Sequence, residues 1–256
     1  MLSHLSKYSG RPSILALALL SGCATDHHVR TLVLFETYQS SPADSHLDQL
    51  PNAEENAGRV SKALASLSTA QKPDPTSSQP LTREVWQSKT TRFTSTLTDK
   101  DYAVVYISAH GAVNSAGDIE LFDTGGGAFP VTDELQAIMN KASASVFFLD
   151  ICREADKASV HSSSSGVRLV GSNGTILFST DLGRDAGDAS IFSKQIEHEI
   201  TKRQELRVTL RNIMKNVIEQ SGRTSNPDLR QHPWTYGLIP SDIYLAGPPP
   251  KPGTGP

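Results

Sequence analysis

The chain has 256 residues, of which 37% are hydrophobic and 20% are charged, and its formal net charge is −3. This composition is that of an ordinary globular protein, and it excludes a disordered, collagen-like or strongly basic nucleic-acid-binding chain. Beyond the N-terminus there is no run of about eighteen apolar residues, which excludes an internal membrane-spanning helix. The length fits one α/β domain with short extensions.

The N-terminal end has the pattern of a targeting segment. Two basic residues precede a wholly apolar stretch at 14–20, which is too short to span a bilayer, and the tetrad LSGC follows at 20–23. This tetrad is similar to the lipobox of bacterial lipoproteins. The resemblance implies a signal peptide over 1–22, cleavage before Cys23, and acylation of the cysteine sulfur and the new amino group.

Two or more acyl chains anchor a protein stably, so this interpretation predicts a protein held at a bacterial membrane. Ala24 is not the aspartate that often retains lipoproteins at the inner membrane, so we expect an outer-membrane anchor facing the periplasm. The alternatives are an ordinary secretory signal with an incidental cysteine, or a misassigned start codon.

Four short apolar runs predict buried strands that belong to one parallel sheet. The runs are 31–35 (TLVLF), 102–107 (YAVVYI), 145–149 (SVFFL) and 175–178 (TILF). Apolar residues at helical spacing predict helices near 53–68 and 205–220. We also expect a polar helix near 88–98, a helix near 189–203, and one that begins at an N-cap on Thr132. Strands that alternate with helices indicate a parallel sheet covered on both faces.

The remaining segments are less regular. We predict a short strand near 82–85, a loop with a small hairpin over 112–130, a mobile serine-rich loop over 154–172, and a last short element around Trp234 and Leu238. The domain organisation is therefore a signal peptide (1–22), a tether (23–30), one domain (31–243) and a disordered Pro/Gly-rich tail (244–256).

His110 and Cys152 each come just after a predicted strand, and parallel α/β sheets carry their working residues at that edge. Hydrolysis by a cysteine needs a thiolate, a base to prepare it, and donors for the tetrahedral oxyanion. A cysteine on a strand-to-loop turn can be partly exposed, and histidine titrates near neutral pH. Gly111 lets the backbone approach a substrate closely, so its N–H and that of Cys152 are candidate oxyanion donors.

Residues 102–111 (YAVVYISAHG) resemble the strand and His-Gly turn of the caspase, metacaspase and orthocaspase superfamily. Residues 145–153 (SVFFLDICR) resemble its nucleophile strand, notably the Asp-x-Cys-Arg form of bacterial members. From position 110 to position 152 the separation is 42 residues, near the roughly 50 typical of caspases. Weaker similarity at four further segments extends the resemblance over about 31–240; these are 50–64, 117–123, 176–192 and 231–234.

The resemblance implies a caspase-like (caspase-hemoglobinase) three-layer α/β sandwich, with a mostly parallel central sheet and helices on both faces. It also implies a cysteine endopeptidase that acts on proteins or peptides through a dyad of Cys152 and His110. Two alternatives stay open. One is a caspase-like pseudoenzyme that binds a partner through the same cleft, and the other is a lipoprotein scaffold whose Pro-rich tail docks an envelope protein. The oligomeric state is left undetermined.

Metacaspases and orthocaspases cleave after Arg or Lys, and an aspartate two residues before the nucleophile lines the pocket that binds this side chain. Asp150 has that position, and a carboxylate can bind a guanidinium through two parallel hydrogen bonds. The second pocket aspartate of the branch falls at Asn56 here, which leaves the charge of the pocket open. Asp150 could equally serve to order the nucleophile loop.

No metal or cofactor is expected. Cys152 has no second cysteine beside it, and His27 and His28 lie in the predicted tether, so no zinc ligand set is apparent. Calcium activates some relatives, and three aspartates lie close together at 181, 185 and 188. Scattered loop carboxylates are a weak metal signal, so calcium is left open without being assigned a site.

Overall fold

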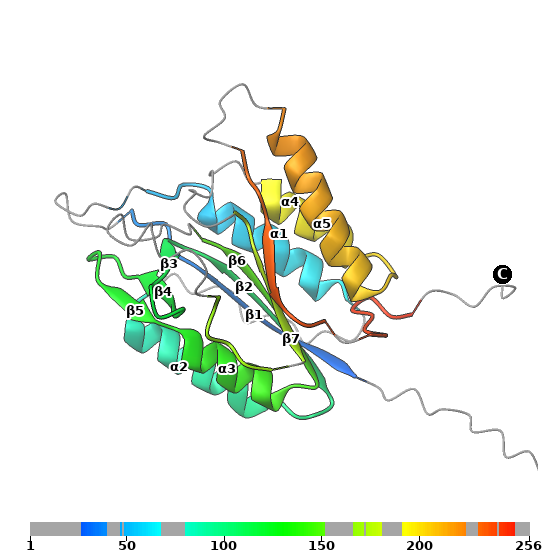
Figure 1. Ribbon diagram of the computed structural model, residues 1–256. Coiled ribbons are helices and arrows are strands. Elements are labelled where there is room, and N and C mark those ends of the chain that lie inside the picture. Colours follow the sequence, from blue (N-terminus) through cyan, green and yellow to red (C-terminus); the bar gives the residue numbers. More distant parts are fainter. Residues whose placement is uncertain are drawn as a thin grey trace, which may run out of the picture.

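The computed structural model describes residues 27–39, 47, 49–67, 80–151, 166–171, 173–180, 191–223, 230–239 and 241–248. A five-stranded sheet in the order β1-β2-β6-β7-β8 forms its centre (Figure 1). The strands are β1 (His28–Phe35), β2 (Asp101–Ser108), β6 (Ala144–Asp150), β7 (Gly174–Phe178) and β8 (Trp234–Gly237). The first four are parallel, and β8 runs antiparallel to β7 at the edge. The predicted mostly parallel sheet is confirmed.

Helices cover both faces of this sheet. Figure 1 shows α2 and α3 on one side and α1, α4 and α5 on the other. Their bounds are α1 (Ala53–Ala65), α2 (Arg83–Thr96), α3 (Thr132–Lys141), α4 (Ile191–Ile200) and α5 (Leu206–Ser221). The three-layer α/β sandwich expected from the sequence is therefore the observed architecture.

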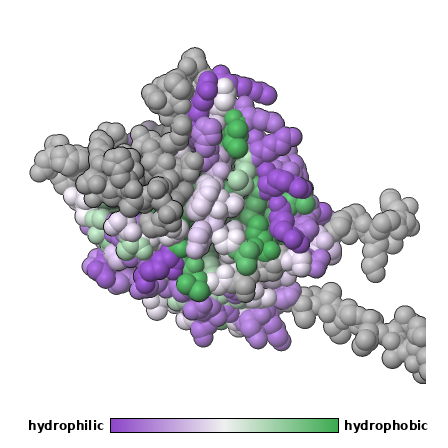
Figure 2. Space-filling view, viewed as in Figure 1, coloured by the Kyte–Doolittle hydropathy of each residue, from purple (hydrophilic) through white to green (hydrophobic). Residues whose placement is uncertain are grey.

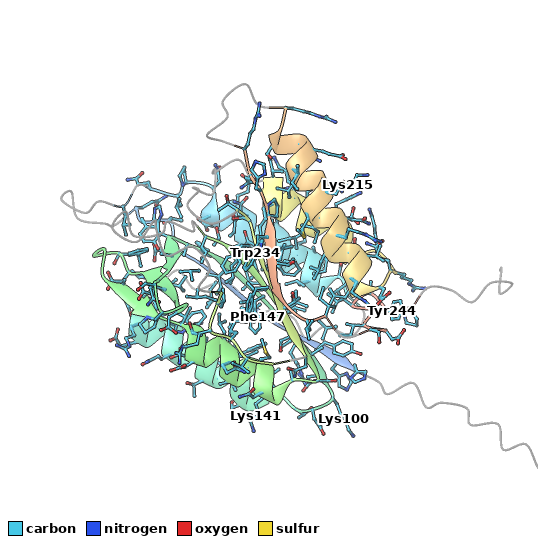
Figure 3. The ribbon with its side chains drawn as sticks, viewed as in Figure 1. Lys100, Lys141, Phe147, Lys215, Trp234 and Tyr244 are labelled. Atoms are coloured by element: carbon cyan, nitrogen blue, oxygen red, sulfur yellow. The ribbon has the colours of Figure 1, made fainter. Side chains whose placement is uncertain are left out.

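Strand β2 shows how the two cores arise, because successive side chains of a strand point to opposite faces. Val105 and Ile107 pack into the core beneath α2 and α3, whereas Val104 and Tyr106 pack into the core beneath α1, α4 and α5. All four are 0% exposed. Phe147 of β6 lies deep in the first of these cores (Figure 3). Burial on both faces explains why these strands read as continuous apolar runs.

The segment that we predicted as a strand near 82–85 is the beginning of helix α2. The Thr82 hydroxyl accepts a hydrogen bond from the Val85 N–H at 3.3 Å and caps the helix. Trp86 and Phe93 are the large buried side chains of α2. The β-branched residues Thr82 and Val85 favour a strand locally, but the packing of Trp86 and Phe93 onto the sheet stabilises the helix instead.

The predicted loop with a hairpin over 112–130 is a small antiparallel sheet of three strands. It consists of β3 (Gly111–Val113), β4 (Ile119–Phe122) and β5 (Ala128–Pro130). β3 continues directly from the end of β2, so this sheet lies beside the carboxyl edge of the central one. The sheet therefore fixes the chain immediately after His110.

The predicted domain boundaries shift at both ends. Residues 28–30, assigned to the tether, form the first part of β1, where Arg30 makes an ion pair with buried Asp101 at 3.1 Å. Leu245, assigned to the tail, is only 4% exposed and packs in the core of α1, α4 and α5. The packed domain thus extends beyond 31–243. Residues 1–26 and 249–256 lie outside the described residues.

Part of the predicted mobile loop is held firmly. Val167 and Leu169 are buried, and the Arg168 N–H donates to the Gly117 carbonyl at 2.8 Å. The Arg168 guanidinium binds Asp118 at 2.8 Å and Asp133 at 3.1 Å. Residues 166–171 are therefore pinned to the small sheet and α3, whereas 152–165 and 172 lie outside the described residues.

The turn between α4 and α5 is built around Glu199, whose side chain is only 2% exposed. Burial alone would raise the pKa of this carboxyl, but hydrogen bonds from Lys202, Gln204 and Asn212 lower it below the ordinary 4.5. We call these four residues the Glu199 cluster.

No helix within the described ranges is both long and apolar enough to cross a membrane.

Candidate active site

The register between β2 and β6 sets the geometry of the candidate site. Ser108, the last residue of β2, pairs with Asp150, the last residue of β6. Just beyond this rung, the Ala109 N–H lies 3.4 Å from the Asp150 carbonyl oxygen and donates to it. His110 and Cys152 each come two residues after the rung in the sequence. His110 is half-buried, and Cys152 lies outside the described residues.

The side chain of Ile151 occupies the space that a side chain of Gly111 would need. A side-chain carbon added at Gly111 would lie 3.1 Å from Cδ1 of Ile151, which is itself fully buried. The same carbon would lie 2.6 Å from the Glu120 carbonyl oxygen. The structure therefore gives the missing side chain a packing purpose that the sequence did not suggest, because it lets the turn after His110 lie against β4 and Ile151.

The N–H of Gly111 points away from the small sheet. The Phe122 N–H donates to the His110 carbonyl at 3.1 Å, which makes these two residues a hydrogen-bonded pair of the antiparallel ladder. Gly111 and Leu121, the next pair in the register, are then a pair without ladder hydrogen bonds. This geometry leaves the Gly111 N–H available as an oxyanion donor.

Tyr38 contacts His110 and was not found by the sequence analysis. Its hydroxyl accepts a hydrogen bond from the His110 backbone N–H at 3.0 Å and donates to the Phe122 carbonyl at 2.7 Å. The two rings have centroids 4.6 Å apart and are tilted by 56°. Tyr38 follows the predicted strand 31–35 by three residues, so the rule that pointed to His110 and Cys152 could also have indicated it.

A buried carboxylate shapes the backbone around Tyr38. Glu36 is 7% exposed, and its carboxylate accepts hydrogen bonds from the N–H groups of Thr37, Tyr38 and Leu81. Tyr38 has a φ of 57°, a left-handed conformation that is uncommon for residues other than glycine. Glu36 therefore joins the end of β1 to the segment that enters α2.

Asp150 is held by a buried phenol. The Tyr106 hydroxyl donates to Oδ2 of Asp150 at 3.1 Å. Burial raises the pKa of Tyr106 well above the ordinary 10, and the negative charge of Asp150 raises it further. The phenol therefore stays protonated and serves as a hydrogen-bond donor that orients the carboxylate.

Asn56, the second predicted pocket residue, is 3% exposed, and its amide oxygen accepts a hydrogen bond from the Ser193 hydroxyl at 2.9 Å. This contact joins α1 to α4. One turn further along α1, the positive charge of Arg59 lies near enough to Tyr106 to lower the pKa of the phenol, against the larger effects described above. The Arg59 guanidinium is itself paired with Glu55 and Glu197.

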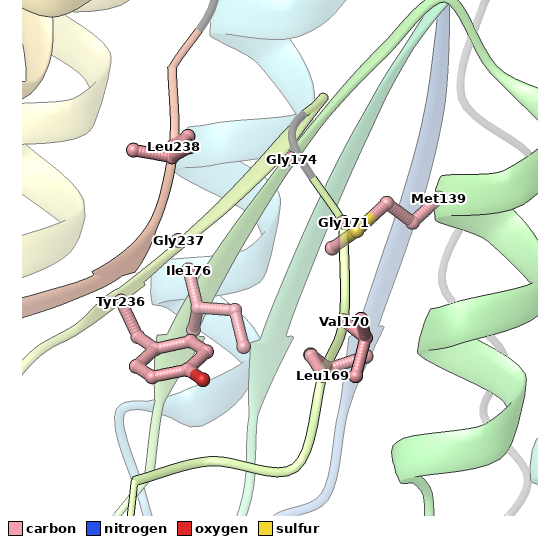
Figure 4. A pocket seen from close by; sticks show the side chains of 9 residues that line it. All are labelled: Met139, Leu169, Val170, Gly171, Gly174, Ile176, Tyr236, Gly237 and Leu238. Atoms are coloured by element: carbon pink, nitrogen blue, oxygen red, sulfur yellow. The ribbon is translucent and has the colours of Figure 1, made fainter.

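An apolar pocket of about 440 Å³ lies elsewhere, between α3, β7 and β8 (Figure 4). Its lining includes Met139, Tyr236 and two highly exposed side chains, Val170 (77%) and Leu238 (63%). In Figure 2 apolar side chains form a broken band on the face that carries β8 in Figure 1, bordered by hydrophilic residues. None of the predicted site residues that the structure describes lines this pocket.

Within the described ranges, no group of three or more His, Cys, Asp or Glu side chains is arranged to hold a metal ion. The three aspartates considered for calcium, at 181, 185 and 188, lie outside the described residues. Calcium dependence therefore stays a prediction.

The comparison with protein families decides the classification. Residues 32–243 match the family model of the caspase domain (peptidase C14). The chain belongs to the caspase-domain family. This confirms the resemblance to the caspase superfamily, whereas membership of its metacaspase and orthocaspase branch stays a prediction. We found no match among curated proteins.

A solved structure agrees with this caspase-domain assignment. Caspase-1 from Spodoptera frugiperda superposes with a TM-score of 0.58 at 16% sequence identity, over 88% of this chain and 95% of that one. At this identity the likeness speaks for the fold alone. The caspase domain nevertheless indicates a cysteine peptidase family whose substrates are proteins or peptides.

Proposed function

We propose that this caspase-domain protein is a cysteine endopeptidase in which Cys152 is the nucleophile and His110 the base. The close approach of Gly111 and Ile151 carries the proposal, because these residues directly follow and directly precede the two members of the dyad. The hydrogen bond between Ala109 and Asp150 joins the same two turns on their other side. Covalent continuity thus limits how far apart the dyad residues can lie.

The chemistry would proceed in two steps. His110 takes the proton of the Cys152 thiol, and the thiolate attacks the carbonyl carbon of the scissile bond. The oxyanion that forms accepts a hydrogen bond from the outward-facing Gly111 N–H. The imidazolium then gives its proton to the leaving amine, which leaves a thioester. Water, deprotonated by His110, attacks the thioester and releases the acid and the free thiol.

We further propose that the enzyme cleaves after Arg or Lys. Asp150 supports this preference, because Tyr106 holds its carboxylate at the same edge of the sheet as His110. Two observations weigh against a strongly anionic pocket. Asn56 is uncharged and bonded to Ser193, and Arg59 places a positive charge near Tyr106.

Covalent labelling tests the dyad. The full chain is treated with arginyl-chloromethylketone, beside Cys152→Ala and His110→Ala variants that keep the same melting temperature. We expect labelling of the wild type and its loss in both variants. A folded wild type that is not labelled, with or without calcium, would favour the pseudoenzyme.

A peptide panel tests the specificity. Peptides that differ only in the residue before the scissile bond are compared at Arg, Lys, Leu and Asp. We expect Arg and Lys to be preferred, and Asp150→Asn to reduce this preference while leaving alkylation of Cys152 by iodoacetamide intact. Preference for Asp would overturn the assignment of Asp150 without affecting that of the dyad.

The envelope location is a separate proposal that rests on the sequence around Cys23. We propose that the protein is lipidated at Cys23 and held at the outer membrane, facing the periplasm. Metabolic labelling with radioactive palmitate in a bacterial host is expected to mark the wild type and not Cys23→Ala. Equal labelling of the two proteins, or none of either, would refute it.

A further inference from the structure

We propose that Tyr38 is a positioning residue that holds the backbone and ring of His110 in the orientation needed for proton transfer. The inference rests on the proposed function, since it assigns Tyr38 a part in the same reaction. It goes further by naming a residue from the end of β1, which neither the motif nor the strand that carries the histidine contains.

Three hydrogen bonds close a ring around the histidine. The His110 N–H donates to the Tyr38 hydroxyl, this hydroxyl donates to the Phe122 carbonyl, and the Phe122 N–H donates to the His110 carbonyl. The distances are 3.0, 2.7 and 3.1 Å. Both polar groups of the His110 peptide backbone are therefore fixed, and the ring joins the end of β1, the turn after β2 and the end of β4.

The side chain of the histidine is confined as well. The ring of Tyr38 is 1% exposed, and its centroid lies 4.6 Å from that of the imidazole. A buried aromatic wall at this distance limits the rotamers that His110 can adopt on that side. Tyr38 thus acts on the histidine through two independent contacts, one polar and one through its ring.

Tyr38 is itself held in place by its neighbours. Its left-handed backbone, with φ of 57°, directs the ring, and such conformations persist only where surrounding contacts enforce them. The Glu36 carboxylate supplies that enforcement by binding the N–H groups of Thr37 and Tyr38 at 2.9 Å each. Rare backbone conformations of this kind cluster at functional sites, which agrees with a positioning role.

The expected consequence is kinetic. A proton passes between His110 and Cys152 only if the imidazole stays within hydrogen-bond reach of the thiol. Greater freedom of the imidazole therefore lowers kcat more than it changes substrate binding. Tyr38→Phe removes both hydrogen bonds of the hydroxyl and keeps the ring. Tyr38→Leu removes the hydrogen bonds and the aromatic wall.

The chain offers a matched control. Tyr102, at the opposite end of β2, also stacks on a histidine, with its ring centroid 4.4 Å from that of His27. Tyr102→Phe makes the same chemical change far from the candidate site. All three variants are made in the full chain and compared for kcat, KM and melting temperature.

We expect Tyr38→Phe to lower kcat about tenfold and Tyr38→Leu about a hundredfold, with KM within about twofold of the wild type. Tyr102→Phe should leave kcat unchanged. A Tyr38→Phe protein with wild-type kcat would overturn the inference. A fall in kcat equal to that of Tyr102→Phe at the same loss of melting temperature would also overturn it, since the effect would then be structural.

A second measurement decides the inference if the wild type proves inactive, a result that would remove only the proposed function. The ¹H–¹³C NMR signal of the His110 ring is assigned through His110→Ala and followed in the full chain. We expect one sharp signal in the wild type and in Tyr102→Phe, and exchange broadening or several signals in Tyr38→Phe. A single unshifted signal in Tyr38→Phe would show that Tyr38 does not hold the ring.

Discussion

Replacing Gly111 by alanine tests whether the turn after His110 depends on its tight packing. The new methyl group would lie 2.6 Å from the Glu120 carbonyl oxygen, whereas carbon and oxygen in such contacts keep about 3.3 Å. The acceptor is backbone and cannot swing aside, so the turn or β4 must move by roughly 0.7 Å. The methyl group would also press on Ile151 at 3.1 Å, next to the proposed nucleophile.

This displacement predicts two measurable losses. Overpacking of this kind costs about 1–3 kcal/mol, which in a domain of this size lowers the melting temperature by roughly 2–12 °C. A misplacement of about 1 Å costs about a hundredfold in rate, so a shift of roughly 0.7 Å predicts a fall in kcat/KM of tens of fold. Thermal unfolding and hydrolysis of an arginyl peptide measure the two effects in the same preparation.

Gly58→Ala is the matched control. Gly58 lies on the exposed side of α1, and a side-chain carbon there would have no neighbour within 4 Å. Alanine is favoured over glycine in a helix by about 0.8 kcal/mol, so this variant should be slightly more stable and fully active. If Gly111→Ala melted like the wild type and kept its kcat/KM, the packing argument for Gly111 would be refuted.

Three further variants probe other parts of the structure. Folding lowers the pKa of Glu199, so its carboxylate stabilises the protein above pH 4.5 and loses this effect as the pH falls through the pKa of the folded state. The unfolding free energies of the wild type and Glu199→Gln should therefore converge on acidification, and a difference that stays constant with pH would contradict this. Tyr106→Phe removes the donor to Asp150 and should lower kcat/KM for arginyl peptides about tenfold, near 1.4 kcal/mol, with no change expected if Asp150 does not bind substrate. Gly237→Ala adds a side chain at a φ of 98° against the Gly174 carbonyl, so it should lower the melting temperature by several degrees while kcat stays near that of the wild type; an unchanged melting temperature would show that β8 shifts freely.

The sequence predicted the central strands well because burial on both faces leaves a purely apolar signature. It missed the start of β1, where Val29 is the only apolar residue and an ion pair links Arg30 to Asp101, 71 residues away. It also missed the start of α2, where a cap formed by Thr82 and burial of Trp86 outweigh local strand propensity. Patterns of neighbouring residues could not reveal contacts between residues so far apart in the sequence.

The candidate site likewise has parts that the sequence predicted and parts that it did not. The positions of His110 and Asp150 could be predicted, because each lies at the carboxyl end of an apolar strand. The register of β2 with β6 confirms that these two strand ends are adjacent. The place of Tyr38 shortly after a predicted strand could have marked it as a candidate, but its contact with His110 spans 72 residues and depends on a left-handed backbone, which no motif or periodicity signals. The oxyanion role of Gly111 stays a prediction from its chemistry, and its packing against Glu120 and Ile151 appears only in three dimensions.

The parallel direction of β1 and β2 also determines which edge of the sheet lies beside the N-terminal segment. β1 begins at His28, beside Lys100 and the stacked rings of His27 and Tyr102, whereas His110 follows the far end of the eight-residue strand β2. Eight residues of extended chain rise about 26 Å. A molecule held by that segment would therefore carry its histidine at the opposite edge of the sheet, separated from the start of β1 by about this length of strand.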